Sequence, residues 1–131
     1  MTDPELPFPS GPFVDHLGLR ITEVAADRVV ATWTAGERHH QPYGIVHGGV
    51  HASVVETLGS VGSATWFGDR GKVVGVNNST DFYRAVSEGE LTSVATPIHQ
   101  GRTQQVWVIE TKDADGRLIS RGQLRVQNLP T

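Results

Sequence analysis

The chain has 131 residues, 37% of them hydrophobic and 19% charged, which predicts one folded domain over residues 1–131 with a packed core. Eleven Lys and Arg against 14 Asp and Glu give a net charge of −3, which argues against nucleic acid or an anionic membrane as the main partner. Cys is absent, which excludes disulfides, thiolate zinc sites and cysteine nucleophiles.

The N-terminal residues 1–12 predict an extended, proline-rich lead-in. They lack the basic and apolar regions of a signal peptide. No segment of the chain offers about 18 uninterrupted apolar residues, so we predict no membrane span and expect a cytoplasmic protein. Pro12–Gly18 predicts one short helical turn closed by Gly18, and residues 19–33 predict two short strands rich in β-branched and aromatic residues.

A long helix is predicted over Gly49–Trp66, closed near Gly68. Glu56 is its only charged residue. The helix propensity is poor, because Gly59, Gly62 and many β-branched residues interrupt it. A helix of this kind must be stabilised by burial rather than by propensity.

Helical periodicity divides this helix into two faces. One face is apolar and carries Val50, Val54, Leu58, Val61 and Thr65. On the opposite face Glu56 has only small neighbours, namely Gly49, Ala52, Ser53, Gly59, Ser60 and Ser63. Small residues let another backbone or a ligand approach closely, so we expect the helix to pack on both sides with Glu56 in a poorly solvated groove.

After Gly71 the pattern indicates strands to the end of the chain. Four are predicted, over residues 73–80, 91–98, 102–112 and 117–127, and turn signals separate them. In the last one, apolar or small residues alternate with Arg and Gln at period two. No gap is long enough for a helix, so the sheet should be antiparallel. The fold class is therefore α+β, with one long buried helix on an antiparallel sheet.

The stretch from His39 to Gly49 has the composition of a site and ends where the long helix begins. The N–H groups of Gly48 and Gly49, at the positive end of the helix dipole, could stabilise an oxyanion without a metal. Gln41 and His47 add neutral hydrogen-bond donors, and Glu56 could act as a base two turns further along the helix.

Structural interpretations of these residues remain open. Glu56 could form an ion pair with an arginine of the sheet, and His47-Gly48-Gly49 could be only a tight helix entry. His39 and His40 are expected in a solvated loop, and His51 in the core. A zinc site of His47, His51 and Glu56 is disfavoured, because Glu56 points roughly 140° away from His51 around the helix. We therefore expect no metal and no cofactor.

The run from His40 to Gly49, with Glu56 nine positions after His47, resembles the signature of hotdog-fold acyl-CoA thioesterases. The resemblance covers about Leu17 to Val126 and is closest to the PaaI-like branch, which includes phenylacetyl-CoA, hydroxybenzoyl-CoA and dihydroxynaphthoyl-CoA thioesterases. It implies a long helix wrapped by an antiparallel sheet. It also implies edge-to-edge dimers with sites at the subunit interface, often paired into homotetramers.

The resemblance also implies roles for single residues. Gln41 and the N–H of Gly48 would polarise the thioester carbonyl, next to Gly49, and His47 would orient the thioester. Glu56 of the partner subunit would be the general base or nucleophile, and Ser60 would hold the attacking water. Arg84 and Arg102 match positions where relatives place cations near the nucleotide of CoA.

Two positions depart from the dihydroxynaphthoyl-CoA pattern, in which His stands at the position of Phe82 and Pro at that of Ala85. Phe82 would make the acyl site more apolar, so a plain aryl or a fatty acyl group competes with a phenolic one. Two other functions remain as alternatives: a hydroxyacyl dehydratase of the same fold, and a non-catalytic acyl-CoA binding protein. The dehydratase spacing is absent, and a binding protein would not need Glu56.

Overall fold

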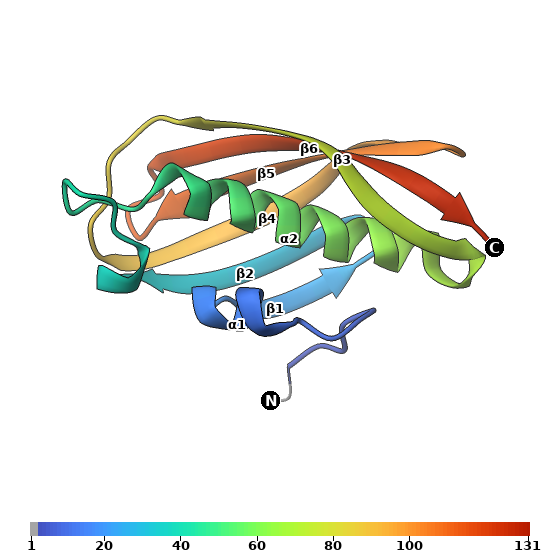
Figure 1. Cartoon of the computed structure of the whole chain (residues 1–131), viewed down its shortest axis with the longest axis horizontal. Coiled ribbons are helices and arrows are strands. Elements are labelled where there is room, and N and C mark those ends of the chain that lie inside the picture. Colours follow the sequence, from blue (N-terminus) through green and yellow to red (C-terminus); the bar gives the residue numbers. More distant parts are fainter. Residues whose placement is uncertain (1–2) are drawn as a thin grey trace.

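The structure contains one sheet of six strands in the order β1-β2-β4-β5-β6-β3, with every neighbouring pair antiparallel (Figure 1). It is a computed structural model that describes residues 3–131. The strands are β1 (Arg20–Ala25), β2 (Arg28–Ala35), β3 (Gly71–Phe82), β4 (Gly89–Gln100), β5 (Gln104–Asp113) and β6 (Leu118–Pro130). The predicted antiparallel sheet is confirmed.

The helix α1 (Pro12–Leu17) precedes β1. The 3₁₀ turn η1 (Glu37–His39), the helix α2 (Gly48–Phe67) and the 3₁₀ turn η2 (Gly68–Arg70) lie between β2 and β3. Gly18 ends α1 with φ of 76°, a left-handed conformation that glycine adopts without a steric penalty. Its N–H donates to the carbonyl of Asp15. The predicted short turn closed by Gly18 is thus confirmed.

The long helix α2 has 20 residues and lies across one face of the sheet, which curves around it (Figure 1). Val54, Leu58 and Val61 are fully buried there. A Cβ atom added to Gly59 would lie 2.6 Å from Leu124 Cδ2, and one added to Gly62 would lie 2.6 Å from the ring of Trp107. The two glycines that lower the helix propensity therefore allow helix and sheet to approach closely.

Gly59 and Ser63, which the helical periodicity places on the same face as Glu56, are both buried, in line with the expected packing on both sides of the helix, whereas Glu56 is exposed. Ser63 is fully buried, and its carbonyl accepts a hydrogen bond of 3.2 Å from Nε2 of Gln105 on β5. The reason is that α2 contacts all six strands, so the curved sheet covers more of the helix than a single apolar stripe. Only a narrow strip of the α2 surface is therefore left exposed.

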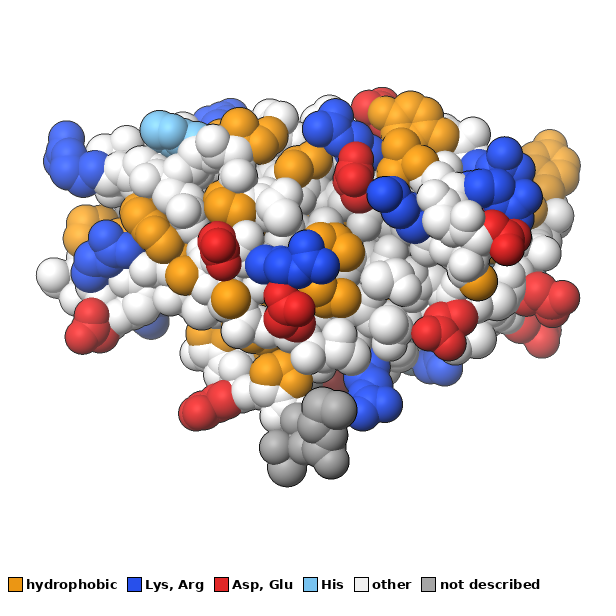
Figure 2. Space-filling view, turned by 180° about the vertical axis from the view of Figure 1, so that it is seen from behind, with side chains coloured by type: hydrophobic (Ala, Val, Ile, Leu, Met, Phe, Trp, Pro, Cys, Tyr) orange, Lys and Arg blue, Asp and Glu red, His pale blue; other side chains and the backbone are white. Residues whose placement is uncertain are grey.

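The predicted alternation in the last strand is confirmed. In β6, Leu124 and Val126 are buried, whereas Arg121 and Arg125 are exposed. Figure 2 shows basic and acidic side chains mixed with apolar ones on the back of the molecule, and Arg121 forms an ion pair of 3.3 Å with Glu110 of β5. Among residues 3–131, no helix is both long and apolar enough to cross a membrane.

The strand β3 forms one edge of the sheet. Its 12 residues pair with β6 alone within the described chain. Val74 and Val76, on this strand, are nearly half exposed. A long edge of this kind leaves a row of backbone N–H and carbonyl groups available for another strand.

Candidate active site

The loop before α2 is a hairpin with a fixed shape. The N–H of Gln41 donates to the carbonyl of Ile45 at 2.9 Å, and the N–H of Gly44 donates back to the carbonyl of Gln41. Gly44 has φ of 76°, which a residue with a Cβ rarely adopts. The N–H of His47 then donates to the carbonyl of His39 at 2.8 Å. These hydrogen bonds fix Gln41 and His47 in one hairpin, which leads directly into α2.

His47 is the N-cap of α2. Its Nδ1 accepts a hydrogen bond of 2.7 Å from the N–H of Gly49, and its carbonyl accepts one of 2.9 Å from the N–H of Val50. An Nδ1 that accepts requires the proton of the neutral imidazole to be on Nε2. The exposed His47 side chain therefore presents an Nε2–H donor next to the helix start.

Gly48 is the first residue of α2. Within residues 3–131, its N–H has no hydrogen-bond partner, whereas those of Gly49 and Val50 are both bonded to His47. This free N–H lies at the positive end of the helix dipole, where negative charge is stabilised. It is the donor that an oxyanion site at this place requires.

Gln41 keeps a donor free in the same hairpin. Its Oε1 accepts a hydrogen bond from the N–H of Tyr43. Because the carbonyl end is engaged in this turn, the amide NH₂ is the end that is left to meet a ligand. The predicted role of Gln41 as a neutral donor is compatible with this geometry.

Glu56 lies two turns along α2 and opens into a cavity of about 650 Å³. Its side chain is exposed in the single chain, so the expectation of a poorly solvated carboxylate is not met by this chain alone. Within residues 3–131 it forms no ion pair, so the structural alternative of a salt bridge with an arginine of the sheet is also not realised. Ser53, Thr57 and Ser60 line the cavity beside it.

Several cavity residues were not anticipated from the sequence. Asn78 and Thr80 line the cavity from β3, and Asn78 Nδ2 donates to the carbonyl of Ala52 at 2.9 Å, which fixes β3 to α2. The opposite side is apolar and comes from the N-terminal segment and β1, through Leu6, Phe8, Phe13, Val14 and Ile21. Apolar side chains between the prolines of residues 3–13 were the available signal for packing here.

Phe82 closes the cavity near the helix start. Its ring packs against Gly48 and lies 5.9 Å, centroid to centroid, from the ring of His51. Phe82 thus contacts Gly48 and also lines the cavity that contains Glu56.

The histidines of this region differ in how deeply they are buried. His51 is 3% exposed and packs against Trp33, as predicted for a core residue. Burial, and then the nearby His39, lower its pKa to about 4. The expectation of a solvated His39 is wrong: it is 2% exposed, and its Nε2 donates to the carbonyl of Leu17 at 2.8 Å. His40 is half-buried and bonds the carbonyl of Ser87.

The two arginines considered for the nucleotide lie beside opposite ends of β6. The N–H of Arg84 donates to the carbonyl of Ile119, at the start of β6. The carbonyl of Arg102 accepts from Nδ2 of Asn128, near the end of the same strand. Nine residues of strand span about 30 Å. Arg84 and Arg102 of one chain are therefore not brought together.

A profile of the thioesterase superfamily matches residues 43–120. The chain belongs to this superfamily. The proofreading thioesterase EntH of Cronobacter turicensis is 41% identical over 114 residues, which cover 87% of this chain and 83% of EntH. Thioesterase HI1161 of Haemophilus influenzae superposes with a TM-score of 0.86 at 33% identity, covering 92% of this chain and 85% of that structure. AziG of S. sahachiroi superposes with a TM-score of 0.92 at 52% identity, covering 94% of this chain and all of AziG.

Membership of the superfamily identifies the fold. The long helix packed on a six-stranded antiparallel sheet is the hotdog fold, as the sequence resemblance implied. The chain is a hydrolase of the thioesterase superfamily, and its substrate class is an acyl thioester.

Proposed function

We propose that this thioesterase hydrolyses an acyl-CoA, with an aromatic acyl group, to the free acid and CoA. Glu56 acts as the general base. The N–H of Gly48 and the amide of Gln41 bind the oxyanion, His47 orients the thioester, and Ser60 holds the water. The observation that carries the proposal is the free N–H of Gly48 at the start of the helix whose cavity contains Glu56.

The reacting groups come from two chains. Gly48 and Glu56 are eight residues apart, which is about 12 Å along the helix axis. Oxyanion donors and a general base that act on one thioester each lie about 3 Å from the atoms they serve. The separation favours pairing the Gly48 of one chain with the Glu56 of a partner. The unpaired edge of β3 supports a homodimer, and two such dimers would form a tetramer.

Water is the only co-substrate of this hydrolysis. Glu56 takes a proton from the water as its oxygen attacks the thioester carbon, and the carbonyl electrons move to an oxyanion at Gly48 and Gln41. The oxyanion then collapses, the carbon–sulfur bond breaks, and the CoA thiolate receives the proton that Glu56 took from the water, which regenerates the carboxylate. A thiolate is a good leaving group, so one carboxylate and one oxyanion site are sufficient.

Aromatic side chains support an aromatic acyl group. Phe8, Phe13 and Phe82 line the cavity that also contains Glu56. Rings of this kind pack well against another ring, in offset or edge-to-face geometry. Arg84 and Arg102 are proposed to meet the CoA phosphates, to which the planar guanidinium binds well, and from different chains because of their separation.

Steady-state hydrolysis of benzoyl-CoA, 4-hydroxybenzoyl-CoA, phenylacetyl-CoA and octanoyl-CoA, followed by thiol release, tests this function. We expect the highest kcat/KM among the aryl-CoA substrates. Parallel reactions with the same acyl groups on pantetheine and on a carrier protein distinguish CoA from a carrier-protein thioester. Hydrolysis confined to carrier-protein thioesters, or no aryl preference, would overturn the corresponding part of the proposal.

A further inference from the structure

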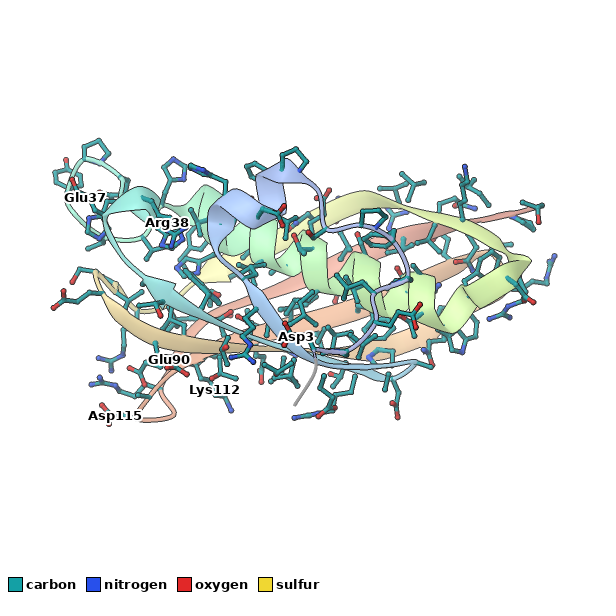
Figure 3. The ribbon with its side chains drawn as sticks, turned by 90° about the horizontal axis from the view of Figure 1, so that it is seen from below. Asp3, Glu37, Arg38, Glu90, Lys112 and Asp115 are labelled. Carbon is teal, nitrogen blue, oxygen red and sulfur yellow. The ribbon has the colours of Figure 1, made fainter. Side chains whose placement is uncertain are left out.

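The N-terminal segment lies over the open face of α2 (Figure 3). Residues 5–8, which we call the strap, separate two cavities along the helix. The near cavity, of about 650 Å³, contains Glu56 and Ser60. The far cavity, of about 680 Å³, is lined by Ala64, Thr65 and Lys72 among others. Leu6 and Phe8 line both cavities, so these two side chains form the partition between them.

The position of the partition along α2 can be read from the residues on its two sides. Ser60 lines the near cavity, and Ala64, one turn later, lines the far one. From Glu56 these residues are about 6 Å and about 12 Å along the helix axis. Leu6 is half-buried and packs against the core, whereas Phe8 is 38% exposed. The near cavity therefore ends between one and two turns from Glu56.

We propose that Leu6 and Phe8 form the end wall of the acyl pocket and restrict this enzyme to compact acyl groups, an aryl group or a short chain. The inference rests on the proposed function, because it takes the Glu56 cavity as the acyl site. The occupant is the acyl group of the thioester, since the cavity joins a carboxylate to apolar walls. A long chain would have to displace the strap to reach the far cavity.

The wall gives a definite dependence on chain length. Each methylene buried in the near cavity should tighten binding by about fourfold. Beyond the wall a further methylene gains nothing, or weakens binding, because Leu6 and Phe8 lose their own contacts. When both side chains are truncated, the two cavities join, and the gain should continue along the helix toward Ala64.

Non-hydrolysable S-alkyl-CoA thioethers test the wall without requiring turnover. Dissociation constants for butyl, hexyl, octyl, decyl, dodecyl and benzyl thioethers are measured by calorimetry for the wild type and for Leu6→Ala/Phe8→Ala in the full chain. In the wild type we expect the tightening to stop near hexyl to octyl. In the double variant we expect dodecyl to bind at least tenfold tighter than in the wild type, with butyl, which ends before the wall, changed less than twofold.

Three further variants make the comparison specific. Adding Ala64→Leu to the double variant refills the far cavity and should reverse the gain for dodecyl. Ile98→Ala removes a half-exposed apolar side chain on β4, outside both cavities, and should leave the profile unchanged. Phe8→Ala alone removes an exposed ring, so it keeps the test available if loss of Leu6 prevents folding.

Identical chain-length profiles in the wild type and the Phe8→Ala and double variants would overturn the wall. A wild type that tightens steadily to dodecyl would overturn it as well. Neither result touches hydrolysis, which is measured separately with the aryl-CoA substrates. Conversely, an inactive wild type that still shows the break near octyl would contradict the proposed function and support the wall.

Discussion

The ring of Phe82 occupies the space that a Cβ atom on Gly48 would need. Such an atom would lie 2.6 Å from Phe82 Cε2, well inside van der Waals contact. Phe82 comes from the end of β3, and Gly48 is the first residue of α2. The contact therefore joins the helix start, with its free N–H, to a side chain that lines the Glu56 cavity.

This contact predicts that substitutions at the two positions are coupled. Gly48→Ala must displace the ring of Phe82, and we expect kcat/KM to fall at least about tenfold. Phe82→Ala removes the clash, so the double variant should resemble Phe82→Ala alone. Kinetics of the four proteins should give a coupling energy of at least about 1.4 kcal/mol, the equivalent of that tenfold loss. As a control, Gly48→Ala and Ile98→Ala should be additive; additivity of Gly48 with Phe82 would contradict the contact.

The base assignment predicts a large loss for Glu56→Gln. The amide keeps the shape but cannot accept the proton of water, so kcat should fall at least about a hundredfold. Folding should be preserved, because Glu56 is exposed and forms no ion pair within residues 3–131. Glu90→Gln, at the start of β4 (Figure 3), is the matched control and should keep its activity. A folded Glu56→Gln protein with near-native turnover would remove Glu56 from the mechanism.

The shared site predicts complementation between inactive chains. Glu56→Gln lacks the base, and Gly48→Val blocks the oxyanion donor. A mixed dimer combines the intact Gly48 of one chain with the intact Glu56 of the other, so one of its two sites should recover. Turnover is measured after mixing the two proteins under conditions where mass spectrometry of differently tagged chains demonstrates exchange. Exchange with no recovered activity would show that each site belongs to a single chain.

His51 predicts a loss of stability in acid. Burial lowers its pKa from 6.5 to about 4 in the folded chain. Between those two values the unfolded chain binds a proton that the folded chain does not, so the free energy of unfolding falls as the pH falls from about 6.5 to 4. The loss is of order 3 kcal/mol at most. Urea unfolding across this range should show it, and His51→Phe should remove most of this slope.

The exposed His16 provides the control for this experiment. His16→Asn should leave the pH dependence of the unfolding free energy between pH 4 and 6.5 unchanged. If His51→Phe has the same slope as the wild type, other groups account for the acid sensitivity.

The arginines predict an effect on KM. Contacts at the nucleotide end are equally strong in the ground and transition states, so Arg84→Ala or Arg102→Ala should raise KM with little change in kcat. The effect should weaken in high salt and disappear with a pantetheine thioester, which has no nucleotide. Equal losses on CoA and pantetheine substrates would show that the arginines are structural.

The sequence by itself determined the elements of the fold and the candidate residues of the site. Period two in β6 separates Leu124 and Val126 from Arg125, and Gly18 marks the end of α1, because burial on one face and a left-handed φ are local requirements. The run from Gln41 to His47 to Glu56 likewise places the proposed oxyanion donor and the proposed base within one short stretch.

Only the tertiary structure decided which faces are covered. The helical periodicity places Gly59 and Ser63 on the face of Glu56, but only the curvature of the sheet around α2 buries these two and leaves Glu56 exposed. His39 is buried because the carbonyl of Leu17, distant in the chain, meets its Nε2. The contact of Phe82 with Gly48 and the partition formed by Leu6 and Phe8 likewise join segments far apart in sequence, whose distances no local period encodes.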